Sequence, residues 1–255
     1  MHVPMTRWLG YRTLVAALLV AFLGSLAANL WLWQRSDRYY RELNALRLDP
    51  YGLQTFPAAT PTVADPNTGT TTVVFVGDSR AAEWVAPDDL AGYRFLNRGI
   101  GSQTSVQVLG RYAAHVAPLR PDIVVIQVGF NDLKTMPLGI ADPATLEQEC
   151  YERIAALVQA AQADQATVIL TTIMPIGPIP LERQLYWSPA IDAARERINA
   201  KLLALAGPEV IVLDTQAILA DATGQLRAEY TRDEVHLNPA GYTALNQALR
   251  QLLSQ

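Results

Sequence analysis

The sequence predicts an α/β protein, a three-layer α/β/α sandwich around a parallel five-stranded sheet, preceded by one N-terminal transmembrane helix. Three observations lead to this prediction. Short apolar runs rich in β-branched residues alternate with helix-like segments from residue 72 onward. An uncharged stretch lies near the N-terminus, and a proline-rich stretch separates it from the alternating part. Such alternation is typical of parallel strands joined by right-handed helical crossovers.

The uncharged stretch, residues 13–33, is long enough to cross a bilayer as a helix. Trp8 and Tyr11 precede it and Trp31 and Trp33 close it, as in the aromatic belts of membrane proteins. We interpret it as a signal anchor in the cytoplasmic membrane, with residues 1–12 as a cytoplasmic tail and the remaining chain outside the cytoplasm. Arginines flank both ends, so charge barely discriminates the orientation. The alternative is a signal peptide cleaved to leave a secreted chain that starts near Ala28.

Residues 34–70 are predicted to connect this anchor to a globular domain at 71–255. Residues 34–48 are charged, with leucines at near-helical spacing, which predicts a short juxtamembrane helix. Prolines then interrupt a Thr- and Ala-rich stretch and predict a linker. These are Pro50, Pro57, Pro61 and Pro66.

The globular domain divides into five predicted strands and several helices. The strands are expected at 72–76, 94–97, 123–128, 167–173 and 210–213. The clearest helices are expected at 143–164 and 191–205, and a last helix at 239–253. Pro143 suits a first helical turn, and Gly207-Pro208 ends the second of these helices.

Composition excludes several classes of function. The formal net charge of −4 gives no electrostatic basis for binding nucleic acid. Cys150 is the only cysteine, so no internal disulfide can form and no Cys/His cluster offers a metal site. We therefore expect neither a metal nor another cofactor.

Polar clusters follow the first three predicted strands, at residues 77–79, 97–101 and 129–132. A fourth, at 233–236, precedes the last helix. Ligands of open parallel sheets bind beyond the carboxyl ends of the strands. We therefore expect these clusters to form one site.

The clusters contain the groups of a serine hydrolase. A serine hydroxyl needs an adjacent base, and the base needs a group that fixes its tautomer. His2 lies at the extreme N-terminus and His115 in a helix-like stretch, which leaves His236 as the base for Ser79. Asp233, three residues before the histidine, is the expected acid, and Asp214 at the end of the fifth strand is the alternative.

With these four blocks the sequence resembles the SGNH (or GDSL) hydrolases, which are flavodoxin-like esterases, lipases and carbohydrate deacetylases. The family letters correspond in order to Ser79, Gly99, Asn131 and His236. The resemblance implies that Ser79 is the nucleophile and that Asp233 is the acid. It also implies an oxyanion hole formed by the N–H groups of Ser79 and Gly99 and by the side-chain amide of Asn131.

Two positions depart from the family pattern. Arg80 stands where the family name has leucine, and Ser102 stands where many members have glycine. We expect Arg80 to form a surface ion pair. The alternative, since it lies beside the nucleophile, is contact with an acidic group of the substrate. The irregular segments 133–142 and 174–189 are candidates for the walls of an acyl or sugar pocket.

The expected function is that of a membrane-tethered serine ester hydrolase. Its acyl-enzyme would form from O-acyl or O-acetyl esters of lipids or envelope glycans. The expected partner is therefore a small-molecule, lipid or glycan ester substrate. Two alternatives remain open: an acyltransferase that uses the same acyl-enzyme, and a non-catalytic surface-binding module with this fold.

Overall fold

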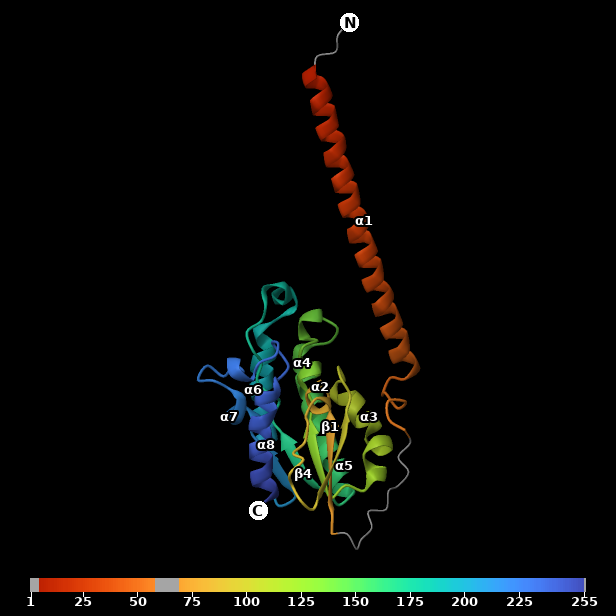
Figure 1. Ribbon diagram of the computed structural model, residues 1–255. Helices are drawn as coiled ribbons and strands as arrows, with labels where there is room; N and C mark the ends of the chain where they lie inside the picture. The colour runs from red at the N-terminus through yellow and green to blue at the C-terminus, as the bar shows by residue number, and fades with distance from the viewer. Residues whose placement is uncertain (1–4, 58–68, 255) are drawn as a thin grey trace. The chain divides into compact units, whose positions relative to one another are not determined.

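The computed structural model describes residues 5–57 and 69–254, with side chains from residue 10 onward (Figure 1). The chain divides into two compact units, Met1–Pro50 and Tyr51–Gln255. We call the second the globular unit. The start of the predicted tail (residues 1–4), most of the predicted linker (58–68) and residue 255 lie outside the described residues.

The first unit contains one continuous helix, α1 (Met5–Leu48). The predicted juxtamembrane helix is its last part, without a break, because no proline interrupts residues 5–49. Contacts one turn apart, such as Arg41 Nε to Asp37 Oδ2 at 2.7 Å, also continue into this part. The segment Gly10–Leu48 has the length and composition of a membrane span, with a mean hydropathy of 2.1 in its most apolar window. A signal sequence near the N-terminus has the same properties.

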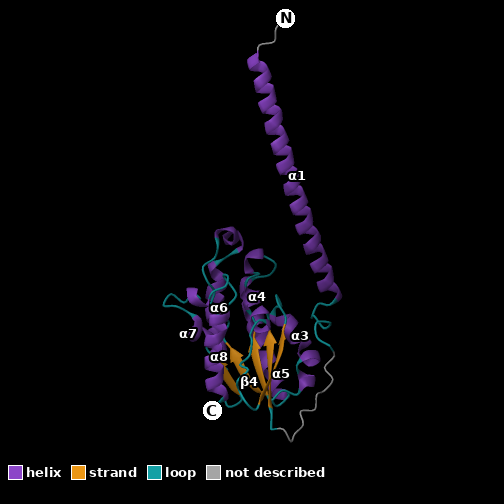
Figure 2. Ribbon diagram, in the orientation of Figure 1, coloured by secondary structure: helices purple, strands orange, loops and turns teal. Residues whose placement is uncertain are grey.

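The globular unit confirms the predicted fold class. Its strands are β1 (Thr71–Gly77), β2 (Tyr93–Gly99), β3 (Ile123–Gln127), β4 (Thr167–Thr171) and β5 (Val210–Leu213). They form a parallel sheet in the order β2-β1-β3-β4-β5 (Figure 2). Gly77 pairs with both Gly99 and Gln127, so β1, β2 and β3 end at one edge of the sheet.

Helices follow most strands and return the chain across the sheet. They are α2 (Ser79–Ala82), α3 (Ser105–His115), α4 (Phe130–Leu133), α5 (Pro143–Ala163), α6 (Pro189–Leu203), α7 (Thr215–Leu219) and α8 (Pro239–Leu253). Short 3-10 turns are η1 (Ala117–Leu119), η2 (Met136–Leu138), η3 (Leu181–Tyr186) and η4 (Ala228–Tyr230). The helices predicted at 143–164, 191–205 and 239–253 are α5, α6 and α8, each of which has proline in its first turn. Their predicted ends differ by no more than two residues from the observed ones.

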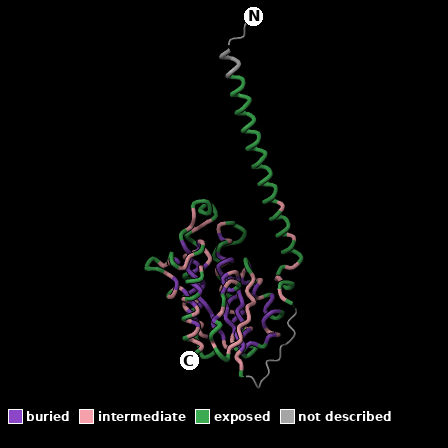
Figure 3. Tube along the Cα trace, in the orientation of Figure 1, coloured by how far each residue is buried: buried purple, intermediate pink, exposed green. Residues whose placement is uncertain are grey.

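The core lies on both faces of the sheet because successive strand residues point to opposite sides. On β1, Val74 and Val76 pack in one cluster with residues of α3, α5 and α6. Val73 and Phe75 pack in the other with Trp84 and residues of α7 and α8. All of these β1 side chains are at most 1% exposed. Figure 3 shows the buried positions, in purple, gathered in the interior of the globular unit. Each contributes about 1.5–3 kcal/mol by burial, so the central strand is strongly fixed.

The globular unit begins before the predicted boundary at residue 71. The ring of Phe56 meets that of His115 edge to face at 5.2 Å, and His115 Nε2 lies 3.2 Å from the carbonyl of Leu53. The ring of Tyr51 lies against Gly110 of α3. Residues 51–57 are therefore not a free linker, because their aromatic side chains pack on α3.

Gly99 sets the distance between β2 and α2. A Cβ atom at this position would lie 2.1 Å from the backbone nitrogen of Ala82. At Gly101, two residues later, the nearest neighbour of such an atom is Ser79 Cβ at 3.9 Å. Alanine substitutions at the two glycines can therefore be compared, one at a crowded position and one at an open position.

We expect Gly99→Ala to destabilise the globular unit, because backbone must move to admit the methyl group. Overpacking costs about 1–3 kcal/mol or more, and each kcal/mol lowers the melting temperature by about 2–4 °C in a domain of this size. Gly101→Ala is the control and should change the melting temperature little. Equal melting temperatures for the two variants would contradict the close approach.

Candidate active site

The turn from β1 to α2 presents Ser79. A side chain at Gly77 would place its Cβ 1.7 Å from the carbonyl oxygen of Gln127, so only glycine fits there. Asp78 then caps α2, and its Oδ1 accepts the N–H of Arg80 at 2.9 Å. Burial raises the pKa of the Asp78 carboxyl above its usual range. The backbone N–H of Ser79 has no hydrogen-bond partner among the described residues.

The turn before α8 brings a histidine to this serine. Ser79 Oγ lies 2.9 Å from His236 Nε2. On the other side of the ring, His236 Nδ1 lies 2.9 Å from Asp233 Oδ2 and 3.0 Å from its Oδ1. The three residues predicted as nucleophile, base and acid are therefore in hydrogen-bond contact, in that order.

Asp233 is held in its ionised form. Burial raises the pKa of its carboxyl, but hydrogen bonds from the N–H groups of Val235 and His236 and from the imidazole outweigh burial. Together they lower the pKa of Asp233 to about 2. The carboxylate thus remains charged at neutral pH, as a group that orients and stabilises an imidazolium must.

The alternative acid, Asp214, has a different role. Its Oδ1 accepts the N–H groups of Gln216 at 3.0 Å and Ala217 at 3.3 Å, which caps α7. It also lies 3.4 Å from Thr172 Oγ1. Both side-chain contacts of His236 Nδ1 within the described residues go to Asp233. The geometry therefore favours Asp233.

Asn131 lies at the start of α4 and is 5% exposed. Its Nδ2 donates one hydrogen bond to the carbonyl of Gln103, at 2.8 Å. An amide nitrogen carries two hydrogens, so a second donor remains. The neighbouring Asp132 braces α4 against α3, because its two oxygens accept the N–H and the hydroxyl of Ser105 at 2.8 and 2.5 Å.

Gly99 differs from the expectation of an oxyanion donor. Its N–H donates to Asn97 Oδ1 at 2.8 Å, so in this structure the donor is already used. The turn that follows approaches the nucleophile, since a Cβ atom at Gly101 would lie 3.9 Å from Ser79 Cβ. Ser102 in that turn has φ of 64°, a left-handed conformation that is uncommon for serine. The N–H groups of Gly101 and Ser102 have no partner among the described residues.

Arg80 is not in a surface ion pair, contrary to the prediction. Its side chain is 1% exposed, and its Nε donates to the carbonyl of Val235 at 2.8 Å. No sequence signal marks this contact, because its acceptor is a backbone atom 155 residues away. Gln103 is a second residue that the sequence did not mark: its Nε2 donates to the carbonyl of Tyr51, and its Oε1 accepts from Arg111 Nε.

Two irregular segments flank the site. In the segment 174–189, Met174 and Ile176 belong to the core, whereas η3 has no buried residue. An ion pair between Arg183 and Glu234 ties η3 to the histidine turn. Just beyond η3, Trp187 stacks on Phe130 of α4 with ring centroids 6.1 Å apart. Exposed apolar side chains lie on both segments: Leu138, Ile140, Leu181, Leu185 and Tyr186.

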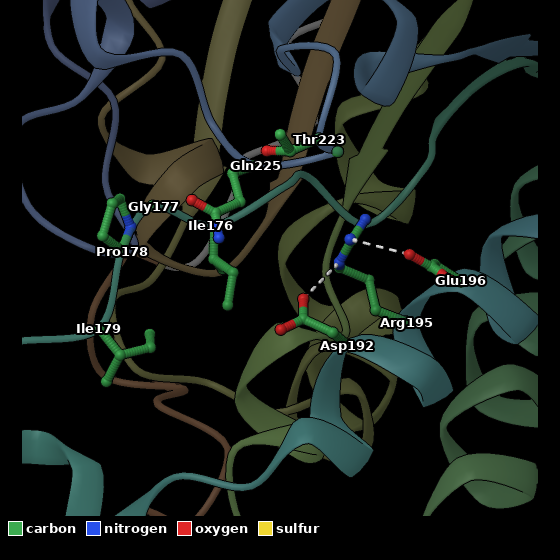
Figure 4. Close-up of a pocket in the computed structure, with 10 residues that line it drawn as sticks. Ile176, Gly177, Pro178, Ile179, Asp192, Arg195, Glu196, Thr223 and Gln225 are labelled. Carbon is green, nitrogen blue, oxygen red and sulfur yellow. Dashed lines mark hydrogen bonds and ion pairs between the residues drawn. The ribbon is translucent and has the colours of Figure 1, made fainter.

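The structure also has a cavity of about 240 Å³ (Figure 4). It is lined by residues 176–179, the first turns of α6 and residues 223–225. The buried Arg195 lines it and bonds Asp192 at 3.3 Å. Ser79, Asn131, Asp233 and His236 do not line this cavity. Among the described residues, no group of three or more His, Cys, Asp or Glu is placed to hold a metal ion.

Comparison with known proteins decides the family. The sequence model of the GDSL-like lipase/acylhydrolase family matches residues 67–244. This chain belongs to that family. It is therefore an ester hydrolase of the GDSL type, with the serine turn and histidine turn described above inside the matched region.

Individual relatives match between 40% and 86% of the chain. Platelet-activating factor acetylhydrolase IB subunit alpha1 of Bos taurus is 30% identical over 204 residues, 75% of this chain and 78% of that protein. Esterase TesA of Pseudomonas aeruginosa is 35% identical over 117 residues, 40% of this chain and 54% of the esterase. The crystal structure of a GDSL-like lipase from Bacteroides thetaiotaomicron is 26% identical, with a TM-score of 0.58, and the match covers 86% of this chain and 96% of the lipase.

Substitution of the two aspartates separates their roles. We expect Asp233→Asn to lower ester turnover by up to about 10⁴-fold, because an amide favours the wrong imidazole tautomer. Its melting temperature should be close to that of the wild type. Asp214→Ala should instead cost about 0.5–2 kcal/mol through loss of the α7 cap, with turnover per folded molecule nearly unchanged. Turnover and thermal unfolding of both variants provide the test, and a larger turnover loss in Asp214→Ala would exclude Asp233 as the acid.

Proposed function

We propose that this protein is a serine ester hydrolase, tethered to the membrane, that acts through an acyl-enzyme. The single observation that carries the proposal is the chain of contacts from Ser79 Oγ through the His236 ring to the Asp233 carboxylate. Nucleophile, base and orienting acid in this order are what acyl transfer to serine requires.

In the first half of the reaction, Ser79 Oγ attacks the ester carbonyl carbon while His236 Nε2 takes the hydroxyl proton. The resulting imidazolium is stabilised by the Asp233 carboxylate. The proton then passes to the alcohol oxygen as the C–O bond breaks, so the alcohol leaves neutral and the acyl group remains on Ser79. In the second half a water molecule attacks the acyl carbon and gives its proton to Nε2. That proton returns to Ser79 Oγ when the acid is released.

The charge on the former carbonyl oxygen requires preorganised donors. We assign these to the N–H of Ser79, the free amide hydrogen of Asn131 and the N–H groups of Gly101 and Ser102. The last two replace Gly99, whose N–H is bonded to Asn97. Loss of one such donor costs about 10²–10³ in rate.

The substrate class we assign is an O-acyl or O-acetyl ester of a lipid or an envelope glycan. The apolar side chains of η3 support an acyl-binding wall, since Leu181, Leu185 and Tyr186 are 79%, 87% and 68% exposed. Relatives named acetylhydrolase and esterase support the ester chemistry. If an alcohol rather than water attacks the acyl-enzyme, the same residues catalyse acyl transfer.

The membrane tether that we assign is residues 13–33, within α1. This stretch combines a lack of charge with aromatic residues at both ends. The globular unit then lies outside the cytoplasm, where lipid and envelope esters are found.

Replacement of the nucleophile tests the proposed chemistry. Ser79→Ala should abolish labelling by a fluorophosphonate probe and lower ester turnover by several orders of magnitude, with melting temperature preserved. Ser254→Ala, near the end of the chain, is the control and should label like the wild type. Turnover by Ser79→Ala within tenfold of the wild type would refute the assignment of Ser79 as the nucleophile.

An ester chain-length panel, with and without alcohol or glycan acceptors, gives the acyl preference and separates hydrolysis from transfer.

Fractionation of cells that express the full chain tests the tether. We expect the protein to stay in the membrane fraction after a high-salt wash and to keep its original N-terminus, because a hydrophobic span holds it. N-terminal sequencing of a soluble form beginning near Ala28 would establish a cleaved signal peptide instead. Protease should reach the globular unit once the outer permeability barrier is removed, whereas protection would reverse the orientation.

A further inference from the structure

Arg80 follows the serine directly, and its guanidinium is buried in the globular unit. Its bonds go to backbone carbonyls: Nε donates to Val235 at 2.8 Å and Nη1 to Met174 at 3.0 Å. The guanidinium carbon also lies 4.8 Å from the ring centroid of Phe130. One side chain thus joins the serine turn to the histidine turn, to the segment after β4 and to α4.

Burial of a cation is costly unless its charge and its hydrogen bonds are compensated. Burial lowers the pKa of Arg80 to about 10, which still leaves it charged at neutral pH. The opposing charge of Asp78, the two carbonyls and the face of Phe130 compensate part of this cost. Leucine, the residue in the family name, could fill the space but would leave both carbonyls without this donor.

The contact with Val235 acts on the histidine because the two residues share a peptide group. The carbonyl edge of that peptide accepts from Arg80, and its N–H edge, which belongs to His236, donates to Asp233 Oδ1 at 2.8 Å. A peptide is planar, so bonds at both edges fix its orientation and the direction in which the next side chain leaves. The orientation of the imidazole therefore depends on Arg80 as well as on Asp233.

The serine side of the contact is held equally firmly. The backbone N–H of Arg80 bonds Asp78, and its carbonyl accepts the hydroxyl of Tyr242 in α8 at 3.1 Å. The path from Ser79 through Arg80, Val235 and His236 returns to Ser79 through the 2.9 Å contact between hydroxyl and imidazole. These residues form a closed ring of bonds around the reacting groups.

We propose that Arg80 is a positioning residue that sets the Ser79–His236 geometry by anchoring the Val235–His236 peptide. The inference rests on the proposed roles of Ser79 and His236. It predicts that weaker anchoring slows the chemical step and leaves substrate binding nearly unchanged, since Arg80 is buried and is not exposed to substrate.

The experiment compares full-length wild type with Arg80→Lys and Arg80→Gln in ester hydrolysis and in the rate of fluorophosphonate labelling. Lysine keeps the charge, but a single ammonium lacks the planar fork that reaches both carbonyls. We expect both variants to lose about tenfold or more in kcat and in labelling rate, with KM within about twofold, because a small misplacement of a catalytic group is costly. Arg195→Lys is the matched control, since Arg195 is equally buried but bonds Gln216 and Asp192. It should keep kcat within about twofold.

Three results would overturn the inference. One is a folded Arg80→Lys or Arg80→Gln with kcat within about twofold of the wild type, and another is a loss confined to KM. The third is loss of the native near-ultraviolet circular dichroism in both variants, because Arg80 would then hold the fold rather than the histidine. Failure of the proposed function is distinct: the wild type would lack esterase activity, or Ser79→Ala would retain it.

Discussion

The hydrogen bond between Ser79 Oγ and His236 Nε2 is the interaction on which the proposed chemistry depends, and it joins residues 157 positions apart. Nothing in the local sequence of either residue places it near the other. The sheet brings them together, because β1 lies between β2 and β3 and ends at the edge that the turn before α8 reaches. A displacement of about 1 Å in such a contact can cost 10²-fold in rate, so the surrounding structure has to be rigid.

Rigidity at this edge comes from buried polar groups rather than from apolar packing alone. Asp78, Arg80, Asp132 and Arg111 are all at most 4% exposed, and each bonds a backbone atom of a turn that carries a site residue or borders one. Burial of these charges costs stability, as the raised pKa of both aspartates indicates. In return, these buried hydrogen bonds hold turns that have no regular secondary structure in one orientation.

The segment that follows α1 also reaches the site. The carbonyl of Tyr51 accepts from Gln103 Nε2 at 2.9 Å, and the carbonyl of Gln103 accepts from Asn131. The residues that would connect a membrane anchor to the enzyme are therefore part of the globular unit, and they support the amide assigned to the oxyanion hole. A chain shortened to the predicted domain start at residue 71 would lack this support.

The sequence by itself determined the fold class, the strand order along the chain and the identities of Ser79, Asn131, Asp233 and His236 as candidates. Strands and helices follow from alternating patterns of local composition, which a single sequence contains. The site candidates then follow because ligands of parallel sheets bind at the strand ends. Three features required the tertiary structure: the use of the Gly99 N–H by Asn97, the burial of Arg80 and the packing of residues 51–57 on α3. The first depends on the conformation of the turn after β2, and the other two on side chains that meet groups distant in the sequence. Residue type and spacing do not specify such contacts. A buried arginine such as Arg80, for example, could bond a carbonyl at any position of the chain, because every residue carries one.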